Sequence, residues 1–311
     1  MASDSHPEVG ARSTRRGMAR ESDGATRRSR RQRPSSPPSF AATLRTLEQL
    51  TAADARVGVH VVDLDEGQVL LAGDDHVTLP VGALGTLPLL VEAASQFASG
   101  ELDPALPVTR EVADPVRMAG LWRLLATDTL PLGDLAILTA AADDALAANA
   151  LLDRVGHERV TRRFVELGMP RSALLDRFRE GRGPDDAPHV ALGTAREFAT
   201  LFSDLVSGRV EGADVSAQVA EWLTYNHDPG LVGAVAGIDP SAHDNDQHGL
   251  LFLNKTGRAA NVRAEVGVLA GPRGGVAYAL LVEFRDASIL HRDRAHEAFR
   301  VLGRELMEFV A

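Results

Sequence analysis

The chain contains no cysteine among its 311 residues, so it has no disulfide framework, no thiolate nucleophile and no cysteine-ligated metal. It also lacks any run of about 18 apolar residues, the length expected of a membrane-spanning helix. No internal repeat is visible. Its 44% hydrophobic and 24% charged residues are ordinary for a soluble globular protein. The length suits two small domains or one domain with two lobes.

Residues 1–40 are poor in apolar residues and rich in arginine. They hold nine arginines and four acidic residues, a net charge of +5 in a chain whose total is −10. The acidic remainder argues against nonspecific nucleic-acid binding by the folded part. A segment with so few apolar residues does not offset its ordering entropy, so we expect a disordered basic tail over 1–39. An arm that binds nucleic acid or a protein partner is the alternative interpretation.

The arginine pairs of this tail are not followed by an apolar stretch. They end at Arg31, and the proline-rich segment 34–38 comes next, whereas an export signal needs an apolar region at that place. We therefore predict a cytoplasmic protein without a signal peptide and without membrane contact.

Apolar spacing divides the remaining residues into two kinds of region. It predicts helices over 40–53, 88–99 and 292–309, helical segments over 132–155, 158–167 and 194–207, and strands over 57–65, 68–72, 250–254, 264–269 and 276–284. Strands from both ends of the chain thus enclose a helical block. We expect one folded domain over 40–311, with a sheet lobe (40–75 and 248–311), a helical lobe (76–247) and a cleft between them.

Three short segments carry the candidate chemistry. Residues 80–88 read Pro-Val-Gly-Ala-Leu-Gly-Thr-Leu-Pro, and residues 143–156 read Asp-Asp-Ala-Leu-Ala-Ala-Asn-Ala-Leu-Leu-Asp-Arg-Val-Gly. Residues 250–257 form an apolar run that ends in Lys-Thr-Gly. In this order and these surroundings they resemble the class A serine β-lactamases and related serine hydrolases of the penicillin-binding superfamily, over about 40–311. The resemblance implies an α+β, transpeptidase-like fold: a five-stranded antiparallel sheet flanked by N- and C-terminal helices, plus an all-helical lobe.

The first segment occupies the place of the family's Ser-x-x-Lys motif. Its flanks match, but Ala83 stands at the position of the nucleophilic serine and Thr86 at that of the lysine. Alanine has no oxygen to attack a carbonyl, and loss of a catalytic nucleophile costs on the order of a million-fold in rate. The hydroxyls of Thr86 and Thr78 are the nearest substitutes. We interpret Thr86 as a small polar helix residue.

The second segment occupies the place of the family's Ser-Asp-Asn motif. Asp143 replaces the serine, Asp144 is retained, and Ala145 replaces the asparagine that would bind the substrate amide. Asp144 is well placed to cap the following helix. Whether Asp143 is a surface carboxylate or a new acid facing the cleft stays open. The Glu-x-x-Leu-Asn segment, whose glutamate activates the deacylating water in the family, is absent from 174–189, where Glu180 is the nearest carboxylate.

The third segment retains the family's Lys-Thr-Gly motif. The resemblance implies that Lys255 supplies positive charge and that the hydroxyl of Thr256 donates a hydrogen bond to a substrate carboxylate. Gly257 lets a ligand approach the strand edge. The alternative is that these are inherited strand residues without a ligand. Residues 243–248 contain histidines and aspartates without metal-site spacing, so we predict a solvated turn, no metal and no cofactor.

The sequence therefore predicts a β-lactamase-like homologue that is catalytically impaired. It could still bind a carboxylate-bearing small molecule or peptide through Lys255, Thr256 and Gly257. Two alternatives stay open. One is an active hydrolase or amide-forming enzyme in which Asp143 or Thr86 has a new role. The other is a non-enzymatic scaffold or regulatory protein that works through its basic tail.

Overall fold

A computed structural model describes residues 39–110, 116, 120–239 and 249–311. Residues 1–38 of the predicted disordered tail and the histidine-containing turn at 243–248 lie outside the described residues. All described residues fall in one compact unit. None of the described helices combines the length and the apolar character that a membrane span needs.

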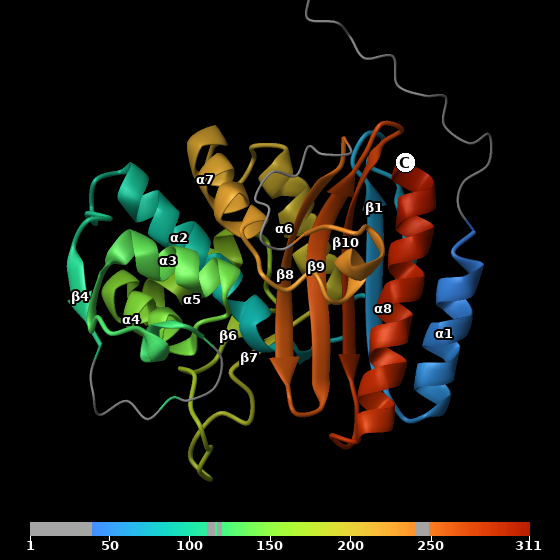
Figure 1. Ribbon diagram of the computed structural model, residues 1–311, viewed down its shortest axis with the longest axis horizontal. Coiled ribbons are helices and arrows are strands. Elements are labelled where there is room, and N and C mark those ends of the chain that lie inside the picture. The colour runs from blue at the N-terminus through green and yellow to red at the C-terminus, as the bar shows by residue number, and fades with distance from the viewer. Residues whose placement is uncertain (1–38, 111–115, 117–119, 240–248) are drawn as a thin grey trace, which may run out of the picture. The chain divides into compact units, whose positions relative to one another are not determined.

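A five-stranded sheet forms the centre of the fold (Figure 1). Its strands are β1 (Arg56–Asp63), β2 (Val69–Gly73), β8 (Leu251–Ala259), β9 (Val262–Ala270) and β10 (Gly275–Glu283). Their spatial order is β2-β1-β10-β9-β8, and every neighbouring pair is antiparallel. The predicted sheet is confirmed. β8 is longer than the predicted strand over 250–254, so the Lys-Thr-Gly motif lies inside an edge strand.

Two helices from opposite ends of the chain cover one face of the sheet. α1 (Ala41–Ala52) packs beside α8 (Ile289–Val310), and α8 packs on β9 and β10 (Figure 1). The carboxylate of Glu305 accepts hydrogen bonds from the backbone N–H groups of Ala42 and Thr43, at 3.1 and 2.9 Å. It thus satisfies two of the free donors at the start of α1 and links α1 to α8.

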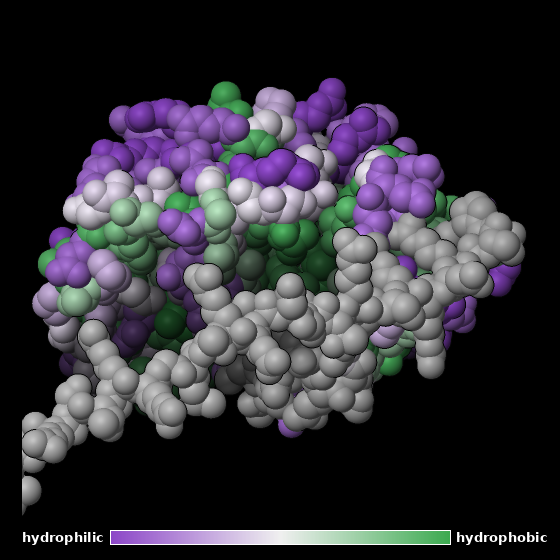
Figure 2. Space-filling model, turned by 90° about the horizontal axis from the view of Figure 1, so that it is seen from above, coloured by the Kyte–Doolittle hydropathy of each residue, from purple (hydrophilic) through white to green (hydrophobic). Residues whose placement is uncertain are grey.

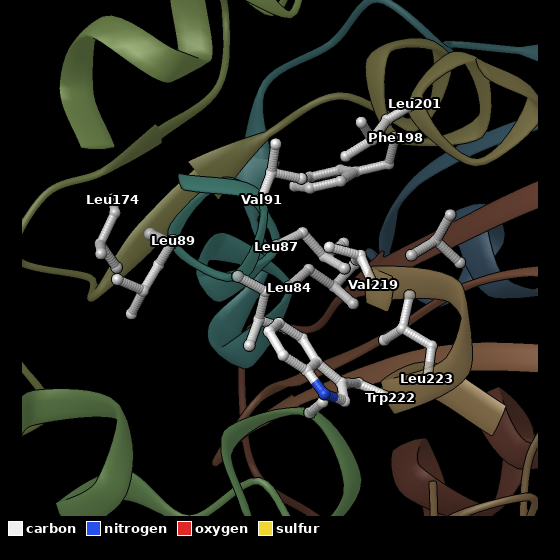
Figure 3. Packing of buried hydrophobic residues seen from close by; sticks show 14 of the residues in the cluster. Leu84, Leu87, Leu89, Val91, Leu174, Phe198, Leu201, Val219, Trp222 and Leu223 are labelled. Carbon is white, nitrogen blue, oxygen red and sulfur yellow. The ribbon is translucent and has the colours of Figure 1, made fainter. Parts of the chain in front are cut away.

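The opposite face of the sheet is covered by α6 (Ala195–Val206), which packs on β1, β9 and β10. Beyond it lie α2 (Leu87–Ala98), α3 (Leu132–Ala141), α4 (Ala145–Val155), α5 (His157–Glu166) and α7 (Ala213–Thr224). Leu87, Leu89 and Val91 of α2 belong to one continuous core with Phe198 of α6 and with Val219 and Trp222 of α7 (Figure 3). A second core lies between the sheet and the pair α1–α8.

The predicted helical run over 132–155 is wrong in one respect, because the chain breaks between α3 and α4. Asp143 has a φ of +50°, a left-handed conformation that interrupts an α-helix and that aspartate tolerates better than most residues. Asp144 then caps α4: its Oδ1 accepts a 2.9 Å bond from the backbone N–H of Ala147. This capping role is as predicted. Apolar periodicity alone does not register such a break.

Short elements make up the rest of the described secondary structure. β3 (Leu79–Pro80), β7 (Ala191–Gly193) and β6 (Ala173–Leu174) form a three-stranded sheet, and β4 (Pro107–Thr109) pairs with β5 (Thr129–Pro131). Three 3-10 helices complete the described residues, η1 (Gly82–Thr86), η2 (Trp122–Leu124) and η3 (Val232–Val235). On the face seen in Figure 2, hydrophilic residues predominate at the periphery, and hydrophobic ones show in a recess near the centre.

Candidate functional site

The Lys-Thr-Gly strand and the degenerate serine motif lie against each other. Two glycines make this possible. A Cβ on Gly257 would collide with the carbonyl oxygen of Val81, and a Cβ on Gly82 would lie 2.9 Å from the backbone nitrogen of Arg258. Gly82 also has a φ of +56°, which favours glycine. β8 and η1 therefore pack backbone to backbone, and the space beside Gly257 is filled by Val81 of the chain itself.

The position of the nucleophile carries no reactive group. Ala83 lies in η1 and is 8% exposed. The hydroxyl of Thr86 is buried and donates a 2.8 Å hydrogen bond to the carbonyl oxygen of Ala83, within its own turn. This threonine therefore serves local structure, as the sequence interpretation holds.

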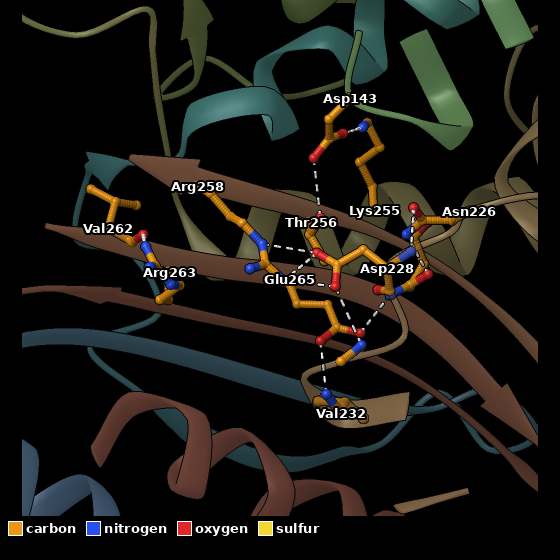
Figure 4. Close-up of polar contacts among 12 residues, drawn as sticks. Asp143, Asn226, Asp228, Val232, Lys255, Thr256, Arg258, Val262, Arg263 and Glu265 are labelled. Atoms are coloured by element: carbon orange, nitrogen blue, oxygen red, sulfur yellow. Dashed lines mark hydrogen bonds and ion pairs between the residues drawn. The ribbon is translucent and has the colours of Figure 1, made fainter. Parts of the chain in front are cut away.

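Lys255, which lies on β8 just before Thr256 and Gly257, contacts Asp143 of the helical lobe (Figure 4). Its ammonium forms an ion pair with Oδ1 of Asp143, and the hydroxyl of Thr256 donates a 3.2 Å hydrogen bond to Oδ2. The Lys255 side chain is fully buried, whereas that of Asp143 is 19% exposed. The question left open for Asp143 is thus answered: its carboxylate faces the Lys-Thr-Gly strand.

Burial governs the charge of Lys255. It lowers the pKa of the ammonium to about 7, because a low-dielectric surrounding disfavours the charged form. The carboxylate of Asp143 opposes this shift by stabilising the ammonium. The described part of the site thus contains one buried cation whose counter-charge comes from a loop at the surface.

A family model described as the "Beta-lactamase enzyme family" matches residues 39–310. The chain belongs to this family. No match is found among curated proteins. The membership covers nearly the whole chain and agrees with the resemblance drawn from the three segments.

Solved structures of β-lactamases and a penicillin-binding protein share the fold. The β-lactamase of Sphaerobacter thermophilus superposes with a TM-score of 0.75 at 21% identity, over 86% of this chain and 97% of its own. PBP-A gives 0.71 at 17% identity, over 89% and 99% of the two chains. A β-lactamase of Xanthomonas campestris gives 0.70 at 18% identity, over 85% and 96%. At these identities the likeness establishes the fold of this family member and leaves its chemistry to its own residues.

A second polar group, which the sequence reasoning missed, borders the site in this β-lactamase-family chain. Arg258 follows the Lys-Thr-Gly motif and makes a bidentate ion pair with Asp228, at 2.6 and 2.9 Å (Figure 4). Asn226 donates a 2.7 Å hydrogen bond to the side-chain oxygen of Asn254, and Asn254 donates to the carbonyl oxygen of Asp228 at 3.1 Å. The segment 226–230 is thereby fixed to the edge strand.

Glu265 anchors this polar group from inside the sheet. It pairs with Thr256 in the β8–β9 register and is fully buried. Its carboxylate accepts hydrogen bonds from the N–H of Val232 at 2.9 Å, from Asn254 at 2.8 Å and from the hydroxyl of Tyr278 at 2.7 Å. Burial nevertheless raises its pKa to about 7, and these donors partly offset that effect. A glutamate within the apolar strand 264–269 was the available sequence signal.

The loop between β6 and β7 contributes no acid at the Lys255 pair. Glu180 is exposed there, and the loop is held instead by Asn149, which exchanges two hydrogen bonds with the backbone of Phe178, at 3.0 and 2.9 Å. Asp176 binds the guanidinium groups of Arg179 and Arg182, both at 2.9 Å. Among the described residues no cluster of histidine and carboxylate side chains could hold a metal ion.

Proposed function

We propose that this chain is a β-lactamase-family protein that binds a carboxylate-bearing small molecule or peptide at Lys255 and Thr256 without forming an acyl-enzyme. One observation carries the proposal: the Asp143 carboxylate accepts from both the Lys255 ammonium and the Thr256 hydroxyl. An internal carboxylate thus occupies the donors that a ligand carboxylate needs.

Acyl transfer lacks its first requirement. The nucleophile position is the methyl group of Ala83, and the hydroxyl of Thr86 is buried and bonded within its own turn. A serine-type reaction needs an oxygen nucleophile next to a base that accepts its proton. Neither group is present at the positions that carry these functions in the family.

Carboxylate binding retains its requirements. Lys255 and Thr256 sit on a rigid strand, and their present partner comes from a loop residue that is partly exposed. A ligand carboxylate that displaces Asp143 keeps the buried Lys255 ammonium paired, and the released aspartate side chain is hydrated by solvent. The apparent affinity is lowered by the fraction of molecules in which Asp143 already occupies the donors. The proposal therefore predicts modest, reversible binding.

Penicillin G is a suitable probe because it carries a carboxylate and because a PBP-A variant has been solved as its acyl-enzyme complex. We expect intact-mass spectrometry to show no added mass after incubation. Calorimetry at pH 6.5 should show reversible binding that is about tenfold tighter in Asp143→Asn and lost in Lys255→Met. Asp185→Asn, which removes an exposed carboxylate of the 174–189 loop, is the matched control. Stable labelling at one residue would sink the proposal, as would equal binding by Lys255→Met.

A second candidate function has one observation in its favour. A lysine with a pKa of about 7 is suited to general acid–base catalysis at neutral pH, and Lys255 contacts a carboxylate. Such a pair could activate water directly and hydrolyse an ester or amide without a covalent intermediate. Steady turnover of penicillin G or an activated ester, without mass addition and lost in both Lys255→Met and Asp143→Asn, would favour this alternative.

A further inference from the structure

A cavity of about 290 Å³ opens in the helical lobe, apart from the Lys255 site. Its wall is one face of α4, because Leu146, Ala150 and Arg154 follow one another at intervals of four residues. β4 and its continuation at Arg110 form the opposite side. The cavity shares no lining residue with the site built on Lys255, so it stands independently of the proposed function.

The floor of the cavity is apolar and contains one unusual donor. Val108 and Leu146 are buried, and Trp122 is fully buried. The indole N–H of Trp122 has no hydrogen-bond acceptor within the described part of the chain. Most buried donors in proteins are paired, and an unpaired one costs about 1–3 kcal/mol. The floor therefore consists of apolar residues that are largely covered, and one of them keeps a donor whose bonding is incomplete.

The rim of the cavity carries more positive than negative charge. Three arginines line it, and Asp153 is the only acid among the lining residues in the described ranges. Arg177 is bonded to that aspartate at 2.8 Å. Arg110 donates to Asp128 at 2.7 Å and to the carbonyl oxygen of Trp122 at 2.6 Å, which holds it over the floor.

Arg154 is the arginine of the rim whose guanidinium group is available to bind a ligand. It is exposed and makes no ion pair with any residue in the part of the chain that the structure describes. Its guanidinium presents planar donors that match a carboxylate or a phosphate group. An apolar floor with a few placed polar groups at its rim is the usual composition of a small-molecule site.

We propose that this cavity binds a small organic anion with an aromatic or apolar body. The body lies on the floor of Val108, Leu146 and Trp122, and the anionic group pairs with Arg154. Carboxylates and phosphates share this recognition chemistry, so the choice between them is a matter for the experiment.

The test uses the full chain and two aromatic anions, phenyl phosphate and phenylacetate, with phenol as the neutral control. The chain has only two tryptophans, Trp122 and Trp222, so its NMR spectrum contains two indole N–H resonances. Trp222→Phe identifies them and keeps an aromatic ring against Phe97, which Trp222 contacts edge to face at 6.2 Å. We expect titration with one or both anions to shift the Trp122 resonance and leave the Trp222 resonance in place. Phenol should bind at least tenfold more weakly.

Arg154→Gln should weaken binding of the anion about tenfold, as expected for loss of one charge-assisted contact. Arg162→Gln removes an exposed charge from α5, outside this cavity, and should have no effect. The proposal is overturned if neither anion shifts the Trp122 resonance at millimolar concentration, if phenol binds as tightly as the anions, or if both arginine variants weaken binding equally. A preference for phenyl phosphate or for phenylacetate assigns the anionic group.

Discussion

The neighbouring strands β8 and β9 each bury one ionisable group, on opposite faces of the sheet, and the two groups are held differently. Lys255 of β8 faces the helical lobe, and Glu265 of β9 faces α1 and α8. Both are fully buried, and burial brings the pKa of each to about 7 from opposite directions. Glu265 accepts from three donors of the fold, whereas Lys255 depends on the partly exposed Asp143.

The difference separates structure from function. The donors to Glu265 are a backbone N–H and two buried side chains, and none of them can leave without disturbing the sheet or η3. The partner of Lys255 can turn into water and be replaced by another carboxylate. Two buried charges with similar pKa values therefore predict different things: Glu265 fixes the fold, and under the proposed function Lys255 exchanges its partner for a ligand carboxylate.

Replacing the side chains of Glu265 and Lys255 should give the largest difference between the two groups, and the quantity that changes is the free energy of unfolding. Glu265→Leu leaves the Val232 N–H and the Tyr278 hydroxyl without their acceptor, and unsatisfied buried donors cost about 1–3 kcal/mol each. We expect a loss of about 4 kcal/mol in the free energy of unfolding. Lys255→Met removes a desolvated charge and leaves Asp143 at the surface, so its loss should stay below about 2 kcal/mol. Urea denaturation measures both; equal losses would contradict the distinction.

The pH dependence of stability should differ in sign for the two groups. Glu265 has a folded pKa of about 7 against an ordinary 4.5, so its contribution is fully present below pH 4.5 and is lost as the pH rises through 7. Lys255 has a pKa lowered from 10.5 to about 7 by burial, so stability falls as the pH decreases from 10.5 to 7. The Asp143 carboxylate reduces the second effect in the parent chain.

Two variants separate the contributions of Glu265 and Lys255 to the change of unfolding free energy with pH. Glu265→Gln should remove the decrease in unfolding free energy between pH 4.5 and 7. Asp143→Asn should steepen the increase between pH 7 and 10.5, because the buried ammonium loses its counter-charge. Urea unfolding at pH 5, 7 and 9 gives both slopes. Parallel pH profiles for the parent chain and the two variants would show that neither group titrates as its burial implies.

The sequence predicts the strands and helices that surround the two buried groups better than it predicts the contacts of those groups. Alternating and helical apolar spacing predicts both covering helices and the strands to within about three residues, except the end of β8, which lies five residues beyond the predicted strand. The Asp143–Lys255 pair joins residues 112 positions apart, and no local pattern encodes such a contact. Glu265 was visible only as a charge inside an apolar strand, a signal that does not name its three donors. The motif flanks locate Ala83 and Thr86, but they do not reveal the hydrogen bond from the Thr86 hydroxyl to the Ala83 carbonyl oxygen.

The smallest effects should come from removing the one hydroxyl group that donates a hydrogen bond to each of the two carboxylates, Glu265 and Asp143. Tyr278 donates to Glu265 at 2.7 Å from a fully buried position, and Thr256 donates to Asp143 at 3.2 Å. Tyr278→Phe should cost about 1.5 kcal/mol and raise the pKa of Glu265 further, since a donor to its charged form is lost. Thr256→Val should cost about 0.5 kcal/mol in stability, because the bond is longer and its acceptor is partly exposed, yet it should weaken penicillin G binding severalfold. Urea denaturation and calorimetry on the same two variants measure these quantities. If Tyr278→Phe weakens binding as much as Thr256→Val does, the Glu265 cluster and the Lys255 site are not separate in function.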